Sequence, residues 1–283
     1  MVTAYRPATL QEALSMLKET DGIPLSGGTD LMVRLRAAPG TPARFSRPLV
    51  YVGSLPELLA VEHSEGGSWS IGAGVPLSDL LKLKGLPEAL GAAIREIGSP
   101  AIRNTATLGG NICNASPAAD SLPALLCLNA SARIAGPGGE RLQSLEDFIT
   151  GPGKTALKSG ELLVSILIPP APPMKLFYRK IGTRRANALS KLSVLGMVKI
   201  ENDTVKDLRL AVGAAAPKVV RIPEAEKSCI GRSVSQVAAD HHTLLSMYRE
   251  KVRPITDQRS TAGYRERTAL RLIEEFLTKE LSP

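Results

Sequence analysis

The sequence predicts an α+β protein of two domains, and three observations support this fold class. Short apolar runs typical of buried strands alternate with helical patterns along the 283 residues. A chain of this length ordinarily forms about two domains. The prolines within residues 169–173 cannot continue a helix or a central strand, so they mark a linker. We therefore expect one domain over residues 1–171 and a second over residues 172–283.

The first domain is expected to contain two subdomains, at about residues 1–55 and 56–171, because the order of elements changes near residue 60. The first subdomain opens with strand, helix and strand, and Thr9 is the expected N-cap of the helix. Its predicted elements are strands at 4–5, 23–25 and 49–52 and helices at 9–19 and 30–36. In the second, Gly66-Gly67 indicates a turn between two strands. Its predicted elements are strands at 60–63, 68–74, 130–135 and 162–168, helices at 56–59, 78–83, 87–97, 121–128 and 145–149, and an alternating segment after Pro100.

The second domain is expected to be a three-stranded sheet covered by helices. Its strands are predicted at 175–180, 192–200 and 205–213, with a turn at Asn202-Asp203. Its helices are predicted at 235–239 and 265–281, and the latter is amphipathic through Leu270, Ile273 and Leu277.

Composition excludes several classes of protein. The three cysteines are scattered and form no C-x-x-C motif, which argues against a disulfide framework, a zinc site or an iron–sulfur cluster in this chain and favours a reducing cytoplasm. The net charge of +8 is spread among acidic residues and aromatics are 4%, which disfavours nucleic-acid binding. We expect no transmembrane segment, because no apolar run approaches the ~20 residues that span a bilayer. We also expect no secretory signal, because the N-terminal residues show no charged region followed by an apolar core.

Two glycine pairs are the candidate ligand-binding motifs. Gly27-Gly28 lies in Leu25–Leu31, and Gly109-Gly110 lies in the segment 98–128, ahead of a helix. Glycine lets backbone N–H groups approach a phosphate closely, and a helix N-terminus favours anions. Neither pair has the spacing of a Rossmann fingerprint or a P-loop, so both folds are disfavoured. Each pair alone would more often be an ordinary turn.

Four blocks of the sequence, in order, carry a family resemblance. These are LSGGTDLMVRLR at 25–36, IGSPAIRNTATLGGNICNASPAAD at 97–120, FYRKIGTRRANALSKLS at 177–193 and PITDQRSTAGYR at 254–265. Together they resemble the FAD-binding medium subunit of the molybdenum hydroxylases, the family of xanthine dehydrogenase and aerobic carbon monoxide dehydrogenase. The resemblance covers essentially the whole chain. It implies a two-subdomain FAD-binding domain of the PCMH/vanillyl-alcohol-oxidase-like type, followed by a small C-terminal domain.

The resemblance also implies which residues bind FAD. Residues 24–31 and 107–111 would place backbone N–H groups against the pyrophosphate, and Asp120 would bind FAD hydroxyls through its carboxylate. Ile97 would line the cofactor pocket, and Leu163 and Lys180 would lie beside the flavin, with Leu162 and Arg179 as the neighbouring alternatives. A lysine there could stabilise negative charge on the reduced ring. The expected FAD-binding residues are Pro24, Leu25, Ser26, Gly27, Gly28, Thr29, Asp30, Leu31, Ile97, Thr107, Leu108, Gly109, Gly110, Asn111, Asp120, Leu163 and Lys180, with no catalytic side chain and no metal ligand.

The implied function is that of an electron-transfer oxidoreductase subunit. As the family implies, a large partner subunit carries molybdopterin, a small one carries two [2Fe–2S] clusters, and the assembly is a dimer of heterotrimers. Electrons would reach FAD on this chain and leave to NAD⁺, a quinone or another acceptor. Two alternatives stay open: a stand-alone FAD-dependent oxidoreductase of the same fold, and a non-catalytic FAD-binding interaction module. The hydroxylated substrate is not readable from this chain.

Overall fold

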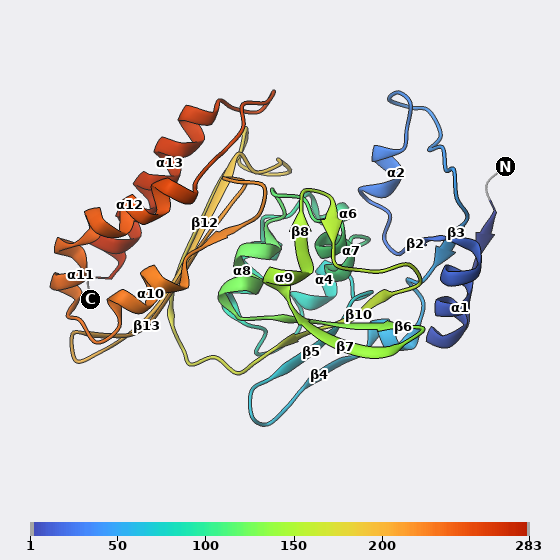
Figure 1. The fold of residues 1–283 in the computed structure, drawn as a ribbon, viewed down its shortest axis with the longest axis horizontal. Coiled ribbons are helices and arrows are strands. Elements are labelled where there is room, and N and C mark those ends of the chain that lie inside the picture. Colours follow the sequence, from blue (N-terminus) through green and yellow to red (C-terminus); the bar gives the residue numbers. More distant parts are fainter. Residues whose placement is uncertain (1–2, 282–283) are drawn as a thin grey trace. The chain divides into compact units, whose positions relative to one another are not determined.

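The computed structural model describes residues 3–281, which group into two compact units (Figure 1). The first contains Met1–Lys84, Ser99–Ala115 and Asn129–Pro170, and the second contains Gly85–Gly98, Ser116–Leu128 and Ala171–Pro283. Two segments of the region before residue 171 thus group with the second unit, and the linear boundary at residue 171 stays a prediction. None of the helices that the structure describes is long and apolar enough to cross a bilayer.

The first unit begins with a small parallel sheet of order β1-β3-β2. Its strands are β1 (Ala4–Tyr5), β3 (Leu49–Tyr51) and β2 (Ile23–Leu25), and α1 (Leu10–Thr20) connects β1 to β2. The hydroxyl of Thr9 accepts a hydrogen bond from the Glu12 N–H, so the predicted N-cap is confirmed. The helix buries Ala13, Leu14 and Leu17 on one face, as its apolar spacing requires.

A five-stranded antiparallel sheet forms the rest of the core of the first unit, in the order β4-β5-β10-β6-β7. The strands are β4 (Val61–His63), β5 (Trp69–Gly72), β10 (Leu162–Ile168), β6 (Ser131–Gly136) and β7 (Gly139–Ser144). The central strand β10 is buried along nearly its whole length, which explains its continuous apolar sequence. The remaining elements are α2 (Leu31–Arg34), α3 (Pro56–Leu59), α4 (Leu77–Leu80), α6 (Pro100–Arg103), α7 (Leu108–Cys113), α9 (Leu145–Phe148), β8 (Ile149–Gly151) and β9 (Lys154–Thr155).

One prediction for the first unit is wrong, and strand β7 was missed. The segment after Pro100 is the short helix α6 rather than an alternating stretch, because the Ser99 hydroxyl caps it by accepting from the Ile102 N–H and proline occupies its first turn. Strand β7 was not expected, because its sequence GERLQS is polar and lies at the sheet edge. Strand β7 forms because it pairs with β6, and not because its own residues have a high strand propensity.

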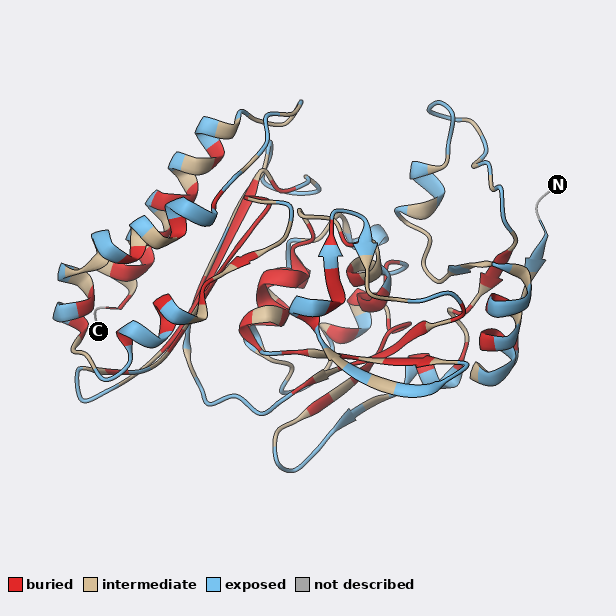
Figure 2. Cartoon of the chain, viewed as in Figure 1, coloured by how far each residue is buried: buried red, intermediate tan, exposed pale blue. Residues whose placement is uncertain are grey.

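The second unit is built on an antiparallel sheet of order β11-β12-β13-β14. The strands are β11 (Lys175–Ile181), β12 (Leu192–Glu201), β13 (Thr204–Gly213) and β14 (Val220–Arg221). The helices are α5 (Glu88–Arg95), α8 (Ser121–Cys127), α10 (Pro223–Cys229), α11 (Val234–Ala239), α12 (His241–Lys251), α13 (Ala262–Glu275) and the π-helix η1 (Phe276–Glu280). Buried residues mark the sheet and the inner faces of α12 and α13 (Figure 2).

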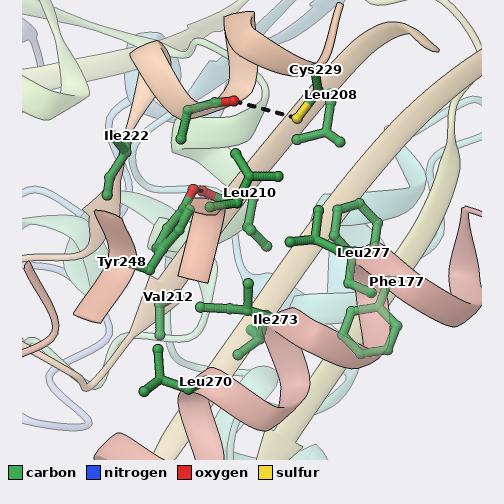
Figure 3. Close-up of a cluster of buried hydrophobic side chains, with 14 of the residues drawn as sticks. Phe177, Leu208, Leu210, Val212, Ile222, Cys229, Tyr248, Leu270, Ile273 and Leu277 are labelled. Carbon is green, nitrogen blue, oxygen red and sulfur yellow. Dashed lines mark hydrogen bonds between the residues drawn. The ribbon is translucent and has the colours of Figure 1, made fainter. Parts of the chain in front are cut away.

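The core of the second unit lies between the sheet and helices α10–α13 (Figure 3). Leu208, Leu210 and Val212 of β13 contribute to the same cluster as Ile273 and Leu277. Tyr248 is fully buried there, and its hydroxyl donates a hydrogen bond to the carbonyl oxygen of Leu210 at 2.9 Å. This pairing satisfies the one polar group that the tyrosine brings into the core.

The three predicted strands of the second unit are confirmed, and the structure adds a fourth, β14. A two-residue strand carries no alternating pattern, so the sequence could not indicate it. Helices α10 and α12 were also not predicted. In the sequence of α12, HHTLLSMYREK, only Leu244 and Tyr248 are buried, so its apolar stripe is too narrow to show a clear period.

An ion-pair cluster holds the connection between α12 and α13. An oxygen of Asp257 lies 2.6 Å from a guanidinium nitrogen of Arg265, and this hydrogen bond is the main cause that lowers the pKa of Asp257 to about 2. Because the carboxylate is only 13% exposed, solvent screens the pair weakly.

We expect Asp257→Asn to lower the free energy of unfolding by about 2 kcal/mol at pH 7. The folded-state pKa is depressed, so this stabilisation is present above the unfolded-state pKa of about 4 and is lost as the pH falls towards 2. Urea unfolding of both proteins at several pH values measures the difference. If the difference in the free energy of unfolding between the two proteins did not shrink as the pH falls, the proposed role of the charged carboxylate would be contradicted.

Candidate functional site

The loop between β2 and α2 presents a run of unpaired backbone N–H groups. Strand β2 ends at Leu25, whose carbonyl accepts from the Val52 N–H, and α2 is entered through a hydrogen bond from the Met32 N–H to the Gly28 carbonyl. Among the described residues, none accepts a hydrogen bond from the backbone N–H groups of residues 26–31. Successive free N–H groups in a turn form an anion-binding concavity.

Two glycines give this loop its shape. Gly28 has φ of +65°, a left-handed conformation that residues with a side chain rarely adopt. At Gly27, a Cβ atom would lie 1.9 Å from the carbonyl oxygen of Thr105, so only glycine permits this close approach to the chain before α7. The glycine pair therefore fixes the loop conformation and its packing against residues 105–106.

A cavity of about 240 Å³ opens against this loop in the first unit. Its walls come from the loop itself and from the region of α7. The lining residues are Ile23, Pro24, Leu25, Ser26, Gly27, Gly28, Thr29, Asp30, Leu31, Arg34, Ala106, Thr107, Gly110, Asn111, Cys113 and Asn114. The buried hydroxyl oxygen of Ser26 has no hydrogen-bond partner in the described part of the chain, which leaves it available to a ligand.

The second glycine pair offers no free backbone donor, and of the two glycines only Gly110 lines the cavity. The N–H groups of Leu108 and Gly109 donate to the carbonyls of Val75 and Ala73. Those of Gly110 and Asn111 donate to the hydroxyl and the carbonyl of Thr107. The expectation that residues 107–111 offer backbone donors to an anion therefore differs from the structure, because each N–H of residues 108–111 already has an acceptor within the chain.

Cys113 is the one thiol at this cavity in the described chain. Burial raises the pKa of its thiol to about 12, so the group stays protonated near neutral pH. A protonated thiol is neither a nucleophile nor a metal ligand. Within residues 3–281, no group of three or more histidine, cysteine, aspartate or glutamate side chains could hold a metal ion.

A second polar cluster lies in the second unit, around Asp120 and Lys180. The Lys180 ammonium lies 2.7 Å from Oδ2 of Asp120 and also donates to the Glu96 carbonyl at 2.6 Å. The Ser190 hydroxyl donates to Oδ1 of Asp120. Burial raises the pKa of Asp120, and the Lys180 charge and both hydrogen bonds oppose this rise. The side chains of Asp120 and Lys180 are only 7% and 8% exposed, so the two charges balance each other away from water.

Both charged side chains of this cluster are engaged within the chain. Asp120 is the N-cap residue of α8, yet its side chain makes no capping hydrogen bond and pairs with Lys180 and Ser190 instead. Lys180 is a buried ion-pair partner of Asp120. Both follow from contacts between residues 60 and 70 positions apart, which no local pattern shows.

A second cavity, of about 270 Å³, adjoins this cluster within the second unit. Lys180 and Tyr178 line it together with the loop at 182–188. The guanidinium of Arg184 donates to the carbonyls of Ala186 and Asn187 and so holds its own loop. The buried Tyr178 hydroxyl has no partner among the described residues, and burial raises the pKa of Tyr178, so it remains a neutral donor.

The structure therefore brings together part of the expected site. Residues 24–31, Thr107, Gly110 and Asn111 share the first cavity. Leu108, Gly109 and Leu163 are buried in the same unit and do not line it. Ile97, Asp120 and Lys180 belong to the second unit, and their role at a shared cofactor stays a prediction. Sequence reasoning missed Arg34, Ser190 and Tyr178, which carry no motif of their own.

Fold and site define a class: α+β proteins of two compact units, with a loop shaped by two glycines between a strand and a helix that lines a cavity. The family follows from comparison with known proteins. Residues 1–171 match the model of the FAD binding domain in molybdopterin dehydrogenase, and residues 177–279 match the CO dehydrogenase flavoprotein C-terminal domain. The chain belongs to this family, the FAD-binding subunits of the molybdenum hydroxylases, and its cofactor is FAD.

Named relatives agree with this family. The chain is 35% identical over 231 residues to the xanthine dehydrogenase FAD-binding subunit of Escherichia coli O157:H7, covering 79% of this chain and 77% of that protein. It is 32% identical to the glyceraldehyde dehydrogenase medium chain of Sulfolobus acidocaldarius, covering 92% and 91% of the two chains. Carbon monoxide dehydrogenase from Hydrogenophaga pseudoflava matches in structure with a TM-score of 0.85 and 25% identity, over 97% and 95%. The expected family and fold class are thereby confirmed.

Proposed function

We propose that this chain is the electron-transfer subunit of a three-component molybdenum hydroxylase. It takes electrons from [2Fe–2S] clusters on a small partner subunit and delivers them to NAD⁺, a quinone or another acceptor. A large partner subunit carries molybdopterin, and two heterotrimers pair in the cytoplasm. Relatives named as FAD-binding subunits and medium chains support this assignment. The three cysteines are all free, which suits a reducing compartment.

The run of unpaired N–H groups at residues 26–31 is the single observation that carries the proposal. A pyrophosphate brings two negative charges, and these donors can neutralise them as dipoles without an arginine clamp. The unpartnered Ser26 hydroxyl adds a further donor on the same loop. The donor set of the cavity therefore fits the pyrophosphate of FAD. Thr107, Gly110 and Asn111 would contribute another part of the wall, with Gly110 leaving room for the phosphates.

Asp120 and its partners are proposed to bind the hydroxyl groups of the cofactor. A carboxylate accepts hydrogen bonds well only when ionised, and the Lys180 ammonium at 2.7 Å favours that form. The Ser190 hydroxyl fixes the orientation of the carboxylate through Oδ1. Bound FAD supplies the redox chemistry itself, so the chain needs no nucleophile or general base. Its own residues bind and orient the cofactor.

The test is to co-express this chain with the small iron–sulfur and large molybdopterin subunits and to purify the complex through a tag on this chain. Substrate added without an acceptor should bleach the visible absorbance of the flavin, and later addition of the acceptor should restore it. Purification of this chain alone, still able to oxidise a substrate with its bound FAD, would favour a stand-alone oxidoreductase. A complete complex whose flavin no substrate reduces would favour a non-catalytic module.

A further inference from the structure

Two charged residues lie on the wall of the cavity in the first unit. Among the described residues that line this cavity, only Asp30 and Arg34 have charged side chains. Both are exposed, and they lie at the two ends of α2, where Asp30 is the N-cap residue and Arg34 is the last residue. The wall therefore contains one carboxylate and one guanidinium in addition to its backbone donors.

The guanidinium of Arg34 is not engaged within the chain. Among residues 3–281, its side chain makes no hydrogen bond, ion pair or ring contact. Asp30, four residues earlier, is the partner that helix geometry offers, because side chains at i and i+4 share one face of a helix. The two side chains nevertheless form no ion pair, and the Asp30 carboxylate makes no capping hydrogen bond. The arginine is therefore free to bind a ligand of the cavity.

The direction of a helical side chain brings this guanidinium towards the loop that precedes α2. In a helix each Cα–Cβ bond tilts towards the N-terminus, and long side chains extend over the preceding turn. The Arg34 N–H donates to the Asp30 carbonyl at 2.9 Å, so the turn before Arg34 begins at Asp30. The backbone N–H groups of residues 26–31, which have no acceptor in the described chain, lie at that end of α2. The guanidinium and these donors can therefore bind one and the same anionic group.

The charge balance of the wall requires a cation when FAD is bound. The pyrophosphate brings two negative charges, and the Asp30 carboxylate adds a third on the same wall. The N–H groups of the loop carry only partial charges, which suit the pyrophosphate but leave the Asp30 charge without compensation. Arg34 is the one cationic side chain among the described residues that line the cavity. A planar guanidinium also matches the oxygens of a phosphate group in geometry.

We propose that Arg34 binds the pyrophosphate of FAD and offsets the negative charge of Asp30 beside it. Its guanidinium donates to phosphate oxygens, while the N–H groups of residues 26–31 donate to the same group from the loop. Arg34 thus recognises the charged part of the cofactor and takes no part in the redox chemistry of the flavin. The inference rests on the proposed function, in which this cavity is the pyrophosphate site.

Substitution of Arg34 tests this contact in the purified chain. Arg34→Gln removes the charge at an exposed position, so the fold should persist, which circular dichroism verifies. Arg36→Gln is the matched control, because it makes the same change at an exposed arginine that does not line the cavity. FAD affinity, measured by titration of the apoprotein, should fall about 10-fold in Arg34→Gln and stay at the wild-type value in Arg36→Gln. Arg34→Lys, which keeps the charge, should recover most of the loss.

The salt dependence of FAD binding distinguishes an ionic contact from a merely structural role of Arg34. Because Arg34 is exposed, dissolved ions screen its charge. The difference in FAD affinity between the wild type and Arg34→Gln should therefore shrink as the KCl concentration rises from about 50 mM to about 500 mM. Arg36→Gln should follow the wild type at every salt concentration.

Equal FAD affinity of Arg34→Gln and Arg36→Gln would overturn the role of Arg34 while leaving the proposed function in place. A loss in Arg34→Gln that does not change with salt, or that Arg34→Lys fails to recover, would also overturn it, because the charge would then not be the cause. A wild-type chain that binds no FAD at any salt concentration would overturn the proposed function itself, and the role of Arg34 with it.

Discussion

Gly110→Val should bind FAD at least about 100-fold more weakly than the wild-type chain, a loss of about 2.7 kcal/mol. Gly110 lines the same cavity as residues 26–31, whose backbone N–H groups are unpaired. A Cβ atom there would lie 2.9 Å from the Thr107 hydroxyl oxygen, so a branched side chain must displace that oxygen or extend into the cavity. Quenching of flavin fluorescence during titration of the apoprotein with FAD measures the affinity.

Gly138→Val is the matched control for this prediction. It makes the same chemical change at a glycine whose Cβ would meet no atom within 4 Å, in the turn between β6 and β7. We expect its FAD affinity to equal that of the wild type. Circular dichroism of both variants establishes that each is folded. If Gly110→Val were folded and bound FAD as well as Gly138→Val does, the cavity would not be the pyrophosphate site.

Asp120→Ala should lower the free energy of unfolding by roughly 3–5 kcal/mol. The Lys180 ammonium, 8% exposed, would lose its carboxylate, and the Ser190 hydroxyl would lose its acceptor. An uncompensated buried charge is among the most destabilising changes that a single substitution can make. Chemical unfolding followed by circular dichroism measures the effect.

The double variant Asp120→Ala/Lys180→Met distinguishes the loss of the ion pair from the cost of leaving the Lys180 charge buried without a partner. Removing both charges should recover a large part of the stability that Asp120→Ala loses, because methionine tolerates burial without a partner. FAD affinity should stay reduced in the double variant, since the carboxylate proposed to bind the cofactor hydroxyls is still absent. Equal stability of the single and double variants would mean that Lys180 finds water or another acceptor once Asp120 is gone.

Sequence patterns predicted the local features of this protein well. Thr9 caps α1 as expected, β10 is a buried strand as its apolar run indicated, and the first glycine pair does line a cavity. Each of these depends on residues close together in the chain. The glycine at position 28 needs a left-handed conformation, and that requirement is also local.

Contacts between distant residues could not be predicted in the same way. The N–H groups of Gly109 and Leu108 donate to the carbonyls of Ala73 and Val75, so they are not free to bind a ligand as the sequence analysis expected. The pairing of Asp120 with Lys180 and Ser190 joins α8 to the strand region of the second unit across 60 and 70 residues. Strand β7 exists because β6 pairs with it, although its own sequence is polar.

The most direct test of the central claim is the cofactor content of the purified chain. The visible spectrum is recorded, and the chromophore released by denaturation is identified as FAD, FMN or nothing. We expect one FAD per chain, lost in Gly110→Val and retained in Gly138→Val. A colourless wild-type protein that also fails to bind added FAD would contradict the account, because the unpaired N–H groups of residues 26–31 would then belong to an ordinary turn.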